Sequence, residues 1–489
     1  MVGAPARRQG GLTAAARRQA GPRRRGHPEL PAHGTTTLAA VPRRVLMAVQ
    51  FFPRGGSAHV TRNLARALPR SGWEVKLVAG SARPPGDAAG FYAGIDVVPV
   101  DMIAALDAPD PMAAEPPMHP SYEDRPGAPD RVFAALDDAA HERQVAAWAR
   151  VLQDAGAADY DALHLHHLTP LNAAAERVAP GVPVIGHLHG TELLMLEEEP
   201  GRWPHLEAWR ERMRHWANGC ERLIMASRSH IQRARETLGI DPGRCVVIPN
   251  GYDPDVFRPR HVDRLDFWHE HLVRSPHGWR PGGEPGSVRY GEGDLHGFAG
   301  DGAVLLYVGR FTGVKRLPLL IEAYTAARPG FARRAPLVIL GGYPGEWEGE
   351  HPVETIERIG AQDVFLAGWH DHAALSGFLS AADVIVLPSV REQFGQVLVE
   401  GMACGLPAIA VDAYGPAEIV RAGHTGWLVA PDDGPALGAA LAEAVGQPAE
   451  RARRGAEAAE DAYARYTWPA LAERVAALYD EVTSSSTRR

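Results

Sequence analysis

The sequence has 489 residues, of which 45% are apolar and 22% charged, so it is long enough for two globular domains with full cores. Its net charge is −8, and because seven arginines lie within residues 1–40, the rest of the chain is more acidic still, which argues against nucleic acid as a partner. The sequence contains no run of 18 apolar residues, so no membrane-spanning helix is predicted. Its three widely spaced cysteines fit neither a disulfide framework nor a zinc ribbon. We therefore expect a cytoplasmic protein.

The amino-terminal part, residues 1–40, is rich in Arg, Gly, Ala and Pro and lacks the apolar core of a secretory signal. We predict a disordered extension without function, and a transit peptide is the alternative. Structure begins with an apolar strand at Arg44–Val49, followed by a loop with Gly55 and Gly56, a helix over Ala58–Ser71 and a strand over Glu74–Val78. This unit is typical of the opening of a doubly wound domain.

The first domain is predicted to span residues 41–250, with a Pro-Asn-Gly turn at its end. Residues 101–140 are crowded with Pro and Asp and predict a long loop at the mouth of this domain, either a lid or a disordered segment. The further strands of the domain are predicted at Ala162–His166, Pro183–His187, Leu223–Ala226 and Val246–Ile248.

After a second irregular stretch at about 259–300, the alternation of strands and helices restarts, which predicts a second domain over 251–466. Two such sets separated by a linker indicate two Rossmann-like domains that face each other. Residues 467–489 are predicted to hold a final amphipathic helix and a tail. The strands of the second domain are predicted at Val304–Val308, Leu337–Leu340, Val364–Leu366, Val384–Leu387 and Ala408–Val411.

Two carboxylates, Glu392 and Glu400, give the strongest chemical signal in the sequence. Glu392 follows a strand at the end where α/β proteins bind ligands, and Glu400 lies in the next helix. Gly395 between them allows a close backbone approach, and the first amides of the helix suit a phosphate. Carboxylates on either side of a diphosphate suit the hydroxyl groups of a ribose and a sugar. The alternative is a solvated loop glutamate and a surface helix glutamate.

A second signal is the pair of cations Arg310 and Lys315, which follow a strand in a loop that begins with Gly309. Two cations in such a loop are a candidate clamp for the diphosphate that departs from a nucleotide sugar. The chain holds only two lysines, Lys76 and Lys315, against 49 arginines. The retention of Lys315 favours a function over an ordinary solvated pair, because a compact ammonium differs from a guanidinium.

Histidines close two strands of the first domain, and their period-two spacing places His187 with His189 and His164 with His166 on common faces. A metal site is conceivable there, but no carboxylate or cysteine partner accompanies the histidines. A histidine that bonds a sugar is the preferred interpretation for His189. The sequence Asp253-Pro254-Asp255 matches a DxD metal motif, yet its proline suits a turn better.

Taken together, these segments resemble the family 4 glycosyltransferases over most of residues 43–480. Glu392 through Glu400 is similar to the EX7E motif of that family, although Gln393 stands where many members have glycine or proline. Further matches are Gly309-Arg310-Phe311 through Lys315, Pro249-Asn250-Gly251-Tyr252-Asp253, Gly405-Leu406-Pro407, Gly415 through Val420, Gly55-Gly56 and His189 before Gly-Thr-Glu.

The resemblance implies a GT-B fold, with the donor cleft between two facing domains, and a retaining transfer of a sugar without an essential metal or other cofactor. It implies that Arg310 and Lys315 hold the diphosphate, that Glu392, with the backbone at Phe394 and Gly395, holds the donor sugar, and that Glu400 holds the ribose. His189 would contact the sugar near the reacting centre, while Gly55 and Gly56 would lie near the phosphates and the acceptor, with Gly309 on the donor side.

The predicted function is therefore transfer of a hexose-type sugar from a nucleotide diphosphate-sugar to a hydroxyl of a small polar molecule. A nucleotide-sugar epimerase or hydrolase and a non-catalytic sugar-binding protein are the alternatives. A phosphorylase is disfavoured, because those resembling glycogen phosphorylase need a pyridoxal-bearing lysine, and only Lys76 and Lys315 exist. The sequence leaves the donor base, the acceptor and the oligomeric state open.

Overall fold

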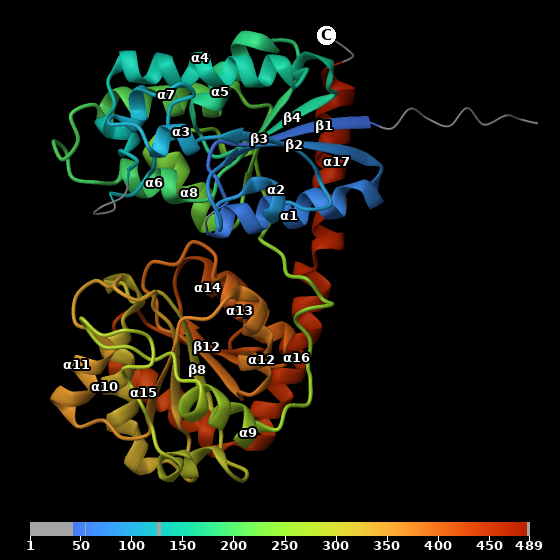
Figure 1. Cartoon of the computed structure of the whole chain (residues 1–489). Coiled ribbons are helices and arrows are strands. Elements are labelled where there is room, and N and C mark those ends of the chain that lie inside the picture. Colours follow the sequence, from blue (N-terminus) through green and yellow to red (C-terminus); the bar gives the residue numbers. More distant parts are fainter. Residues whose placement is uncertain (1–42, 54, 125–128, 487–489) are drawn as a thin grey trace, which may run out of the picture. The chain divides into compact units, whose positions relative to one another are not determined.

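The computed structural model describes residues 43–53, 55–124 and 129–486 (Figure 1). The predicted disordered extension, residues 1–40, lies outside the described residues. Within them, two wholly parallel sheets are each flanked by helices, as the sequence predicts. None of the described helices combines the length and the apolarity needed to cross a bilayer.

The first sheet has the order β3-β2-β1-β4-β5-β6-β7. Its strands are β1 Arg43–Val49, β2 Trp73–Ser81, β3 Asp96–Asp101, β4 Ala162–His166, β5 Val184–His187, β6 Arg222–Met225 and β7 Cys245–Val247. Its helices are α1 Gly56–Ala67, α2 Ala88–Phe91, α3 Ile103–Leu106, α4 Asp138–Asp154, α5 Pro170–Val178, α6 Thr191–Leu196, α7 Leu206–Gly219 and α8 Arg228–Leu238.

Strand β1 shows why the strands of this sheet are continuous apolar runs in the sequence. Leu46 and Ala48 face one core, which the helices α4, α5 and α7 complete. Val45, Met47 and Val49 face a second core on the opposite side, formed with α1 and with α17 (Trp468–Ser486), the last helix of the chain (Figure 1). Because helices cover both faces, Val45 to Val49 have no polar side and are fully buried, whereas Arg43 and Arg44 at the start of the strand are exposed.

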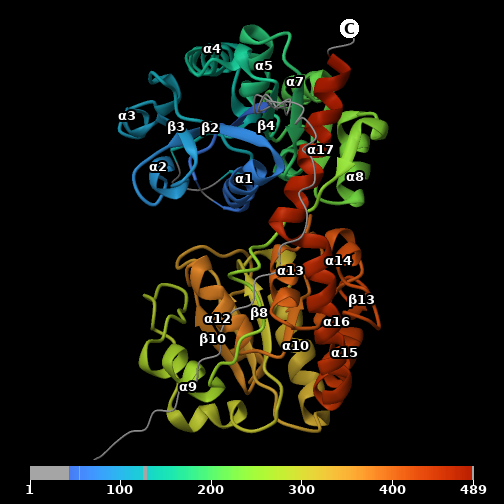
Figure 2. The same ribbon diagram turned by 90° about the vertical axis from the view of Figure 1, so that its right-hand side faces the viewer.

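The second sheet has the order β10-β9-β8-β11-β12-β13, and α10 packs against α11 and α15 while α13 packs against α12 and α16 (Figure 2). Its strands are β8 Leu305–Gly309, β9 Leu337–Gly341, β10 Val364–Gly368, β11 Val384–Leu387, β12 Ala408–Val411 and β13 Gly426–Val429. Its helices are α9 Arg264–His269, α10 Leu317–Ala327, α11 Pro352–Ile359, α12 Leu375–Ser380, α13 Gln396–Ala403, α14 Tyr414–Ile419, α15 Gly434–Gly446 and α16 Pro448–Tyr466.

In both sheets the order of the strands reverses beside the first strand, between β1 and β4 in one sheet and between β8 and β11 in the other. All strands stay parallel. In doubly wound sheets the helices diverge at this switch point, which leaves a crevice at the carboxyl ends of the two strands where ligands bind. In the second sheet these strands are the ones that precede Lys315 and Glu392. The topology therefore places the two strongest sequence signals at one point.

Two sequence predictions differ from the structure. The sheets contain two edge strands, β3 and β13, that were not predicted, and of the two alternatives for 101–140, a lid or a disordered segment, disorder is wrong for the described part, which packs within the first domain. The hydroxyl of Tyr122 donates to the carbonyl of Leu168 at 2.8 Å, and the amide of Gln144 donates to the carbonyl of Met118 at 2.7 Å. Residues 117–122 are buried, because these bonds and an aromatic core hold them.

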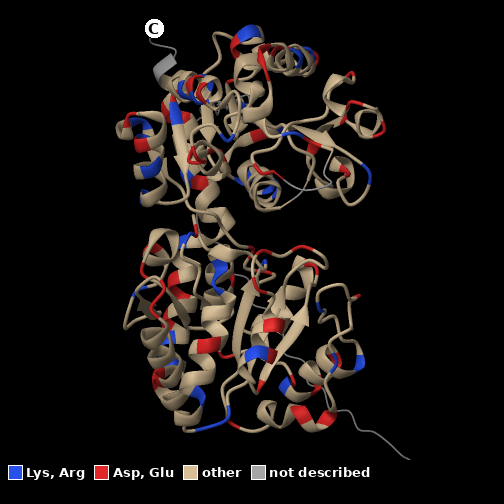
Figure 3. Cartoon of the chain, turned by 90° about the vertical axis from the view of Figure 1, so that its left-hand side faces the viewer, with Lys and Arg blue, Asp and Glu red and all other residues tan. Residues whose placement is uncertain are grey.

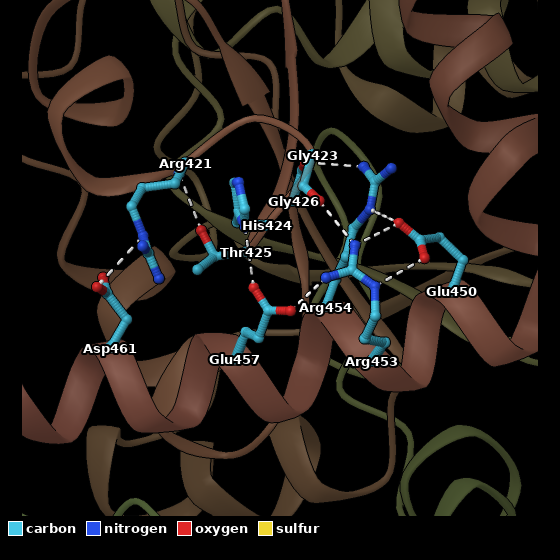
Figure 4. Close-up of polar contacts among 10 residues, drawn as sticks. All are labelled: Arg421, Gly423, His424, Thr425, Gly426, Glu450, Arg453, Arg454, Glu457 and Asp461. Carbon is cyan, nitrogen blue, oxygen red and sulfur yellow. Dashed lines mark hydrogen bonds and ion pairs between the residues drawn. The ribbon is translucent and has the colours of Figure 1, made fainter.

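Charges are distributed over both sheets' surroundings, and in the view of Figure 3 acidic and basic residues intermix. Helix α16 carries the network drawn in Figure 4, which ties it to the loop before β13. Arg454 donates to the carbonyl of Gly426 at 2.9 Å and to Glu450 at 2.7 Å, and its guanidinium lies 4.0 Å from the ring centre of Trp427. These contacts hold α16 against the edge of the second sheet.

Candidate functional site

The loops that follow β8 and β11 form one polar unit at the switch point of the second sheet. The amide of Val390 donates to the carbonyl of Val314 at 3.0 Å, and the hydroxyl of Ser389 donates to the same carbonyl at 3.3 Å. The two loops are thus joined through their backbones. This joint brings Lys315 of the first loop to Glu392 of the second.

Lys315 and Glu392 form an ion pair, and their side chains are only 16% and 19% exposed. The alternative of an ordinary solvated lysine and a solvated loop glutamate is therefore wrong for both residues. Arg310 differs, because its side chain is 69% exposed and the nearest described carboxylate, Glu123, lies 3.9 Å away. The structure brings Lys315 and Glu392 together and leaves Arg310 free to turn toward a ligand.

Glycines bring the backbone of the neighbouring strand close to this unit. Gly341, at the end of β9, has φ of +115°, and a Cβ there would lie 2.2 Å from the carbonyl oxygen of Gly309. A Cβ on Gly342 would lie 2.4 Å from the ring of Phe311. The sequence analysis missed this pair, although two glycines directly after a buried strand are a recognisable signal of close backbone approach.

Helix α13 begins directly after the ion pair, with Gly395 at its N-cap in a left-handed conformation, φ +100°. Phe394 before it is 5% exposed and packs toward Tyr466, which fixes the direction of the helix. Within the part of the chain that the structure describes, no side chain caps the first turn of the helix. Its amide groups are therefore available to an anion such as a phosphate.

Glu400 lies in α13 and is 3% exposed, so the alternative of a surface helix glutamate is wrong. Its Oε1 accepts hydrogen bonds from His372 Nε2 at 2.9 Å and from Gln396 Nε2 at 3.1 Å. Burial alone would lower the pKa of His372, but the hydrogen bond and the charge of Glu400 outweigh it and raise that pKa above 6.5. The sequence analysis missed His372 because nothing in its spacing links it to Glu400.

The histidines of the first sheet form a separate cluster at the carboxyl ends of β4 and β5. His166 Nδ1 and His189 Nε2 are 3.0 Å apart, and His164 Nε2 and His187 Nδ1 are 3.2 Å apart. Burial, followed by the neighbouring histidines, holds the pKa of His189 well below its usual value. His189 is therefore neutral near pH 7 and acts as a hydrogen-bonding group, with one ring nitrogen engaged by His166.

The buried carboxylate of Glu192 fixes the backbone beside His189. It accepts hydrogen bonds from the amides of Gly190 at 2.8 Å and of His189 at 3.3 Å, and it pairs with His167 Nδ1 at 2.7 Å. This carboxylate is the partner of the histidine cluster that the sequence analysis did not recognise.

Three of these buried histidines, His164, His166 and His187, offer ring nitrogens that lie within 4.8 Å of one another, a spacing that could hold a metal ion. The planes of these rings are nearly parallel, with angles of 11° to 26°. The arrangement suits rings that bond to each other.

The glycine loop after β1 is the last of the predicted site segments. Gly55 adopts φ of +83° as the N-cap of α1, and among the described residues, chain neighbours aside, no atom lies within 4 Å of a Cβ placed on Gly55 or Gly56. The start of α1 is therefore open to a ligand that approaches the backbone.

Two protein-family models match this chain. Residues 54–256 match the family model for Glycosyltransferase Family 4, and residues 294–461 match the model for glycosyl transferases group 1. Together the two matches cover most of the chain and include both polar units described above. The chain belongs to the group 1 glycosyltransferases of the GT-B type.

Curated relatives with similar sequences include bacterial inositol phosphate glycosyltransferases. The D-inositol 3-phosphate glycosyltransferase 2 of Catenulispora acidiphila is 29% identical over 332 residues, which is 65% of this chain and 70% of the relative. The enzyme of Thermobispora bispora is 34% identical over 191 residues, which is 38% of this chain and 44% of the relative. This glycosyltransferase is thus an enzyme that transfers sugars, as the sequence predicts.

Solved structures confirm the GT-B fold. The sucrose-phosphate synthase of Thermosynechococcus elongatus superposes with a TM-score of 0.61 at 20% identity and covers 91% of this chain and all of its own. The Anabaena protein HepE, solved with UDP and glucose, has a TM-score of 0.61 at 17% identity and covers 89% of this chain and 99% of its own.

Proposed function

We propose that this glycosyltransferase moves a hexose-type sugar from a nucleotide diphosphate-sugar to a hydroxyl of a small polar acceptor, with retention of configuration and without an essential metal. The observation that carries the proposal is the pairing of Lys315 with Glu392 beside the uncapped start of α13. An ammonium, a sugar-binding carboxylate and free helix amides at one point suit a sugar diphosphate. The curated relatives, named for an inositol phosphate acceptor, support a small cyclic polyol as acceptor.

In the proposed reaction, the bond between the anomeric carbon and the diphosphate oxygen breaks, and a bond from that carbon to the acceptor oxygen forms on the same face. The acceptor proton passes to an oxygen of the departing phosphate. Lys315, Arg310 and the amides at Gly395 stabilise the negative charge that develops on the diphosphate. Glu392 binds hydroxyl groups of the donor sugar, with the backbone at Phe394.

The remaining site residues have roles in the same scheme. Glu400 binds the ribose of the nucleotide, and Gly309 lets the backbone approach the diphosphate. His189, neutral because its pKa is low, bonds the sugar near the reacting carbon. Gly55 and Gly56 leave space at the start of α1 for the phosphates and the acceptor.

A cytoplasmic location is part of the proposal, and it is supported by three cysteines that are all unpaired (Cys220, Cys245 and Cys404). Nucleotide sugars are the co-substrates expected there.

A nucleotide-release assay on purified protein tests this function across UDP-, GDP- and ADP-sugars, with and without a mixture of polyols and aminocyclitols. The expected result is release from one donor that rises when an acceptor is present, and loss of that release in Lys315→Ala. Lys76→Ala is the matched control, because Lys76 lies on β2 and pairs with Asp96. Release that ignores acceptors would instead support an epimerase or a hydrolase. Donor binding without turnover would support a sugar-binding protein.

A further inference from the structure

The carboxylate of Glu400 is held by only one of its two oxygens. Among the described residues, both side-chain hydrogen bonds to it, from His372 Nε2 and Gln396 Nε2, reach Oε1. Gln396 Nε2 also donates to the carbonyl of Gly251 at 2.9 Å, so the glutamine itself is anchored. Oε2 keeps its lone pairs for another donor, and its direction is fixed by the two bonds to Oε1.

His372 is placed for this bond by the turn that follows β10 and by two aromatic neighbours. Its ring centre lies 5.4 Å from that of Phe257 and 5.1 Å from that of His59. Three charged or titratable groups face the ring: Glu400 from α13, and His59 and Arg62 from α1. Burial, followed by His372 and Arg62, lowers the pKa of His59 to about 4. His59 is therefore neutral near pH 7 and packs against a charged His372 without repelling it.

We propose that His372 is a positioning residue that orients Glu400 toward the nucleotide, so that nucleotide affinity depends on whether His372 is protonated. The inference rests on the proposed function, because it takes Glu400 as the residue that binds the ribose. His372 bonds to Oε1 of Glu400, whereas the proposed contact with the nucleotide is made by Oε2. His372 therefore does not need to touch the nucleotide.

The sign of the effect follows from the ion pair. A protonated imidazole gives the buried carboxylate a charge-assisted hydrogen bond, which is about twice as strong as a neutral one. Without it, a carboxylate that is 3% exposed turns toward other donors, which removes an acceptor from the ribose. Because the pKa of His372 is raised, the oriented state persists to higher pH than a free histidine would allow and is lost as the pH rises through that pKa.

The test measures binding of nucleoside diphosphates to the full chain by calorimetry from about pH 6 to about pH 9, a range that begins near the ordinary histidine pKa and extends well above it. UDP, GDP and ADP serve as probes, and the one that binds the unmodified protein most tightly is used throughout. His372→Ala removes the donor, whereas His372→Gln supplies a neutral donor that does not titrate. His424→Gln is the matched control, because His424, in the loop before β13, forms another histidine–glutamate pair at 3.2 Å with Glu457 of α16 (Figure 4).

We expect His372→Ala to weaken binding about 10-fold at the lower pH, the size of a lost hydrogen bond to a charged group. His372→Gln should restore most of the affinity, and the ratio of its Kd to that of the unmodified protein should fall as the pH rises. Equal binding by His372→Ala and the unmodified protein at every pH overturns the inference while leaving the proposed function intact. The same holds if His424→Gln changes the pH profile as much as His372→Gln. Failure of the unmodified protein to bind any of the three probes overturns the proposed function and this inference with it.

Discussion

The ion pair between Lys315 and Glu392 predicts that replacing either partner changes the affinity for a nucleotide, but in opposite directions. If Lys315 binds the diphosphate, an incoming nucleotide must draw the ammonium away from Glu392. Replacing Glu392 with glutamine removes that competitor, so a nucleoside diphosphate that lacks the sugar should bind Glu392→Gln more tightly. The same nucleotide should bind Lys315→Ala more weakly, because the cation itself is gone.

The magnitude follows from the exposure of the pair. Separating a surface ion pair costs about 1 kcal/mol or less, and removing one partner of a fully buried pair costs about 3–5 kcal/mol. The side chains of Lys315 and Glu392 are 16% and 19% exposed, so an intermediate cost of about 2 kcal/mol applies. That corresponds to an affinity change of about 30-fold. Turnover should fall about 100-fold in each variant, since Lys315→Ala loses charge stabilisation and Glu392→Gln loses the sugar contact.

Calorimetric titration of both variants with the best-bound nucleoside diphosphate checks the signs, and the double variant checks the coupling. In the Lys315→Ala background, Glu392→Gln should no longer tighten binding, because there is no cation left to release. A Glu392→Gln variant that binds the nucleotide as weakly as Lys315→Ala would refute the competition argument. Unchanged turnover in Lys315→Ala would refute the assigned role of the lysine.

Three further predictions concern stability and the glycine-lined backbone. Burial lowers the pKa of His164 to about 3, so as the pH falls below 6.5 the unfolded chain takes up a proton that the folded chain does not. The free energy of unfolding therefore falls by about 2 kcal/mol per such histidine by about pH 5. Urea unfolding midpoints should drop steeply between pH 7 and 5. Arg454→Ala should destabilise the protein by about 2 kcal/mol and Arg453→Ala by less than about 0.5, as thermal melts can compare, because their side chains are 10% and 43% exposed. Gly341→Ala should cost about 2 kcal/mol or more and abolish nucleotide binding in titrations, since its Cβ would collide with the carbonyl oxygen of Gly309; normal binding would contradict this account.

The fold was largely predictable because parallel strands buried on both faces are continuous apolar runs, and such runs are visible in a sequence. Strand β11, for example, has the predicted bounds Val384–Leu387. The two missed strands lie at the sheet edges, where β3 contains Pro99 and β13 begins with Gly426. Edge strands tolerate proline and need fewer apolar residues, so their pattern is weak.

The site residues were predictable where each one directly follows a strand whose place in the sheet is typical of a ligand site. Lys315 and Glu392 each follow a strand at the switch point, and the topology brings their loops together. His372 was missed as the partner of Glu400, and Glu192 as the partner of His167, because these contacts join residues on different elements, which no local spacing records. The pairing of Lys315 with Glu392 was also missed, since the sequence suggests separate roles for the two residues.

The return of α17 to the first sheet has a consequence for the order in which the chain folds during synthesis. Trp468, Leu471, Val475 and Tyr479 belong to the core that covers one face of β1, and Tyr479 also bonds to His164. That core stays incomplete while the whole second sheet is being translated, so the nascent first domain exposes an apolar face to the ribosome exit and to chaperones. Ribosomes stalled before residue 468 should therefore carry a first domain that proteases cleave readily, and release of α17 should protect it.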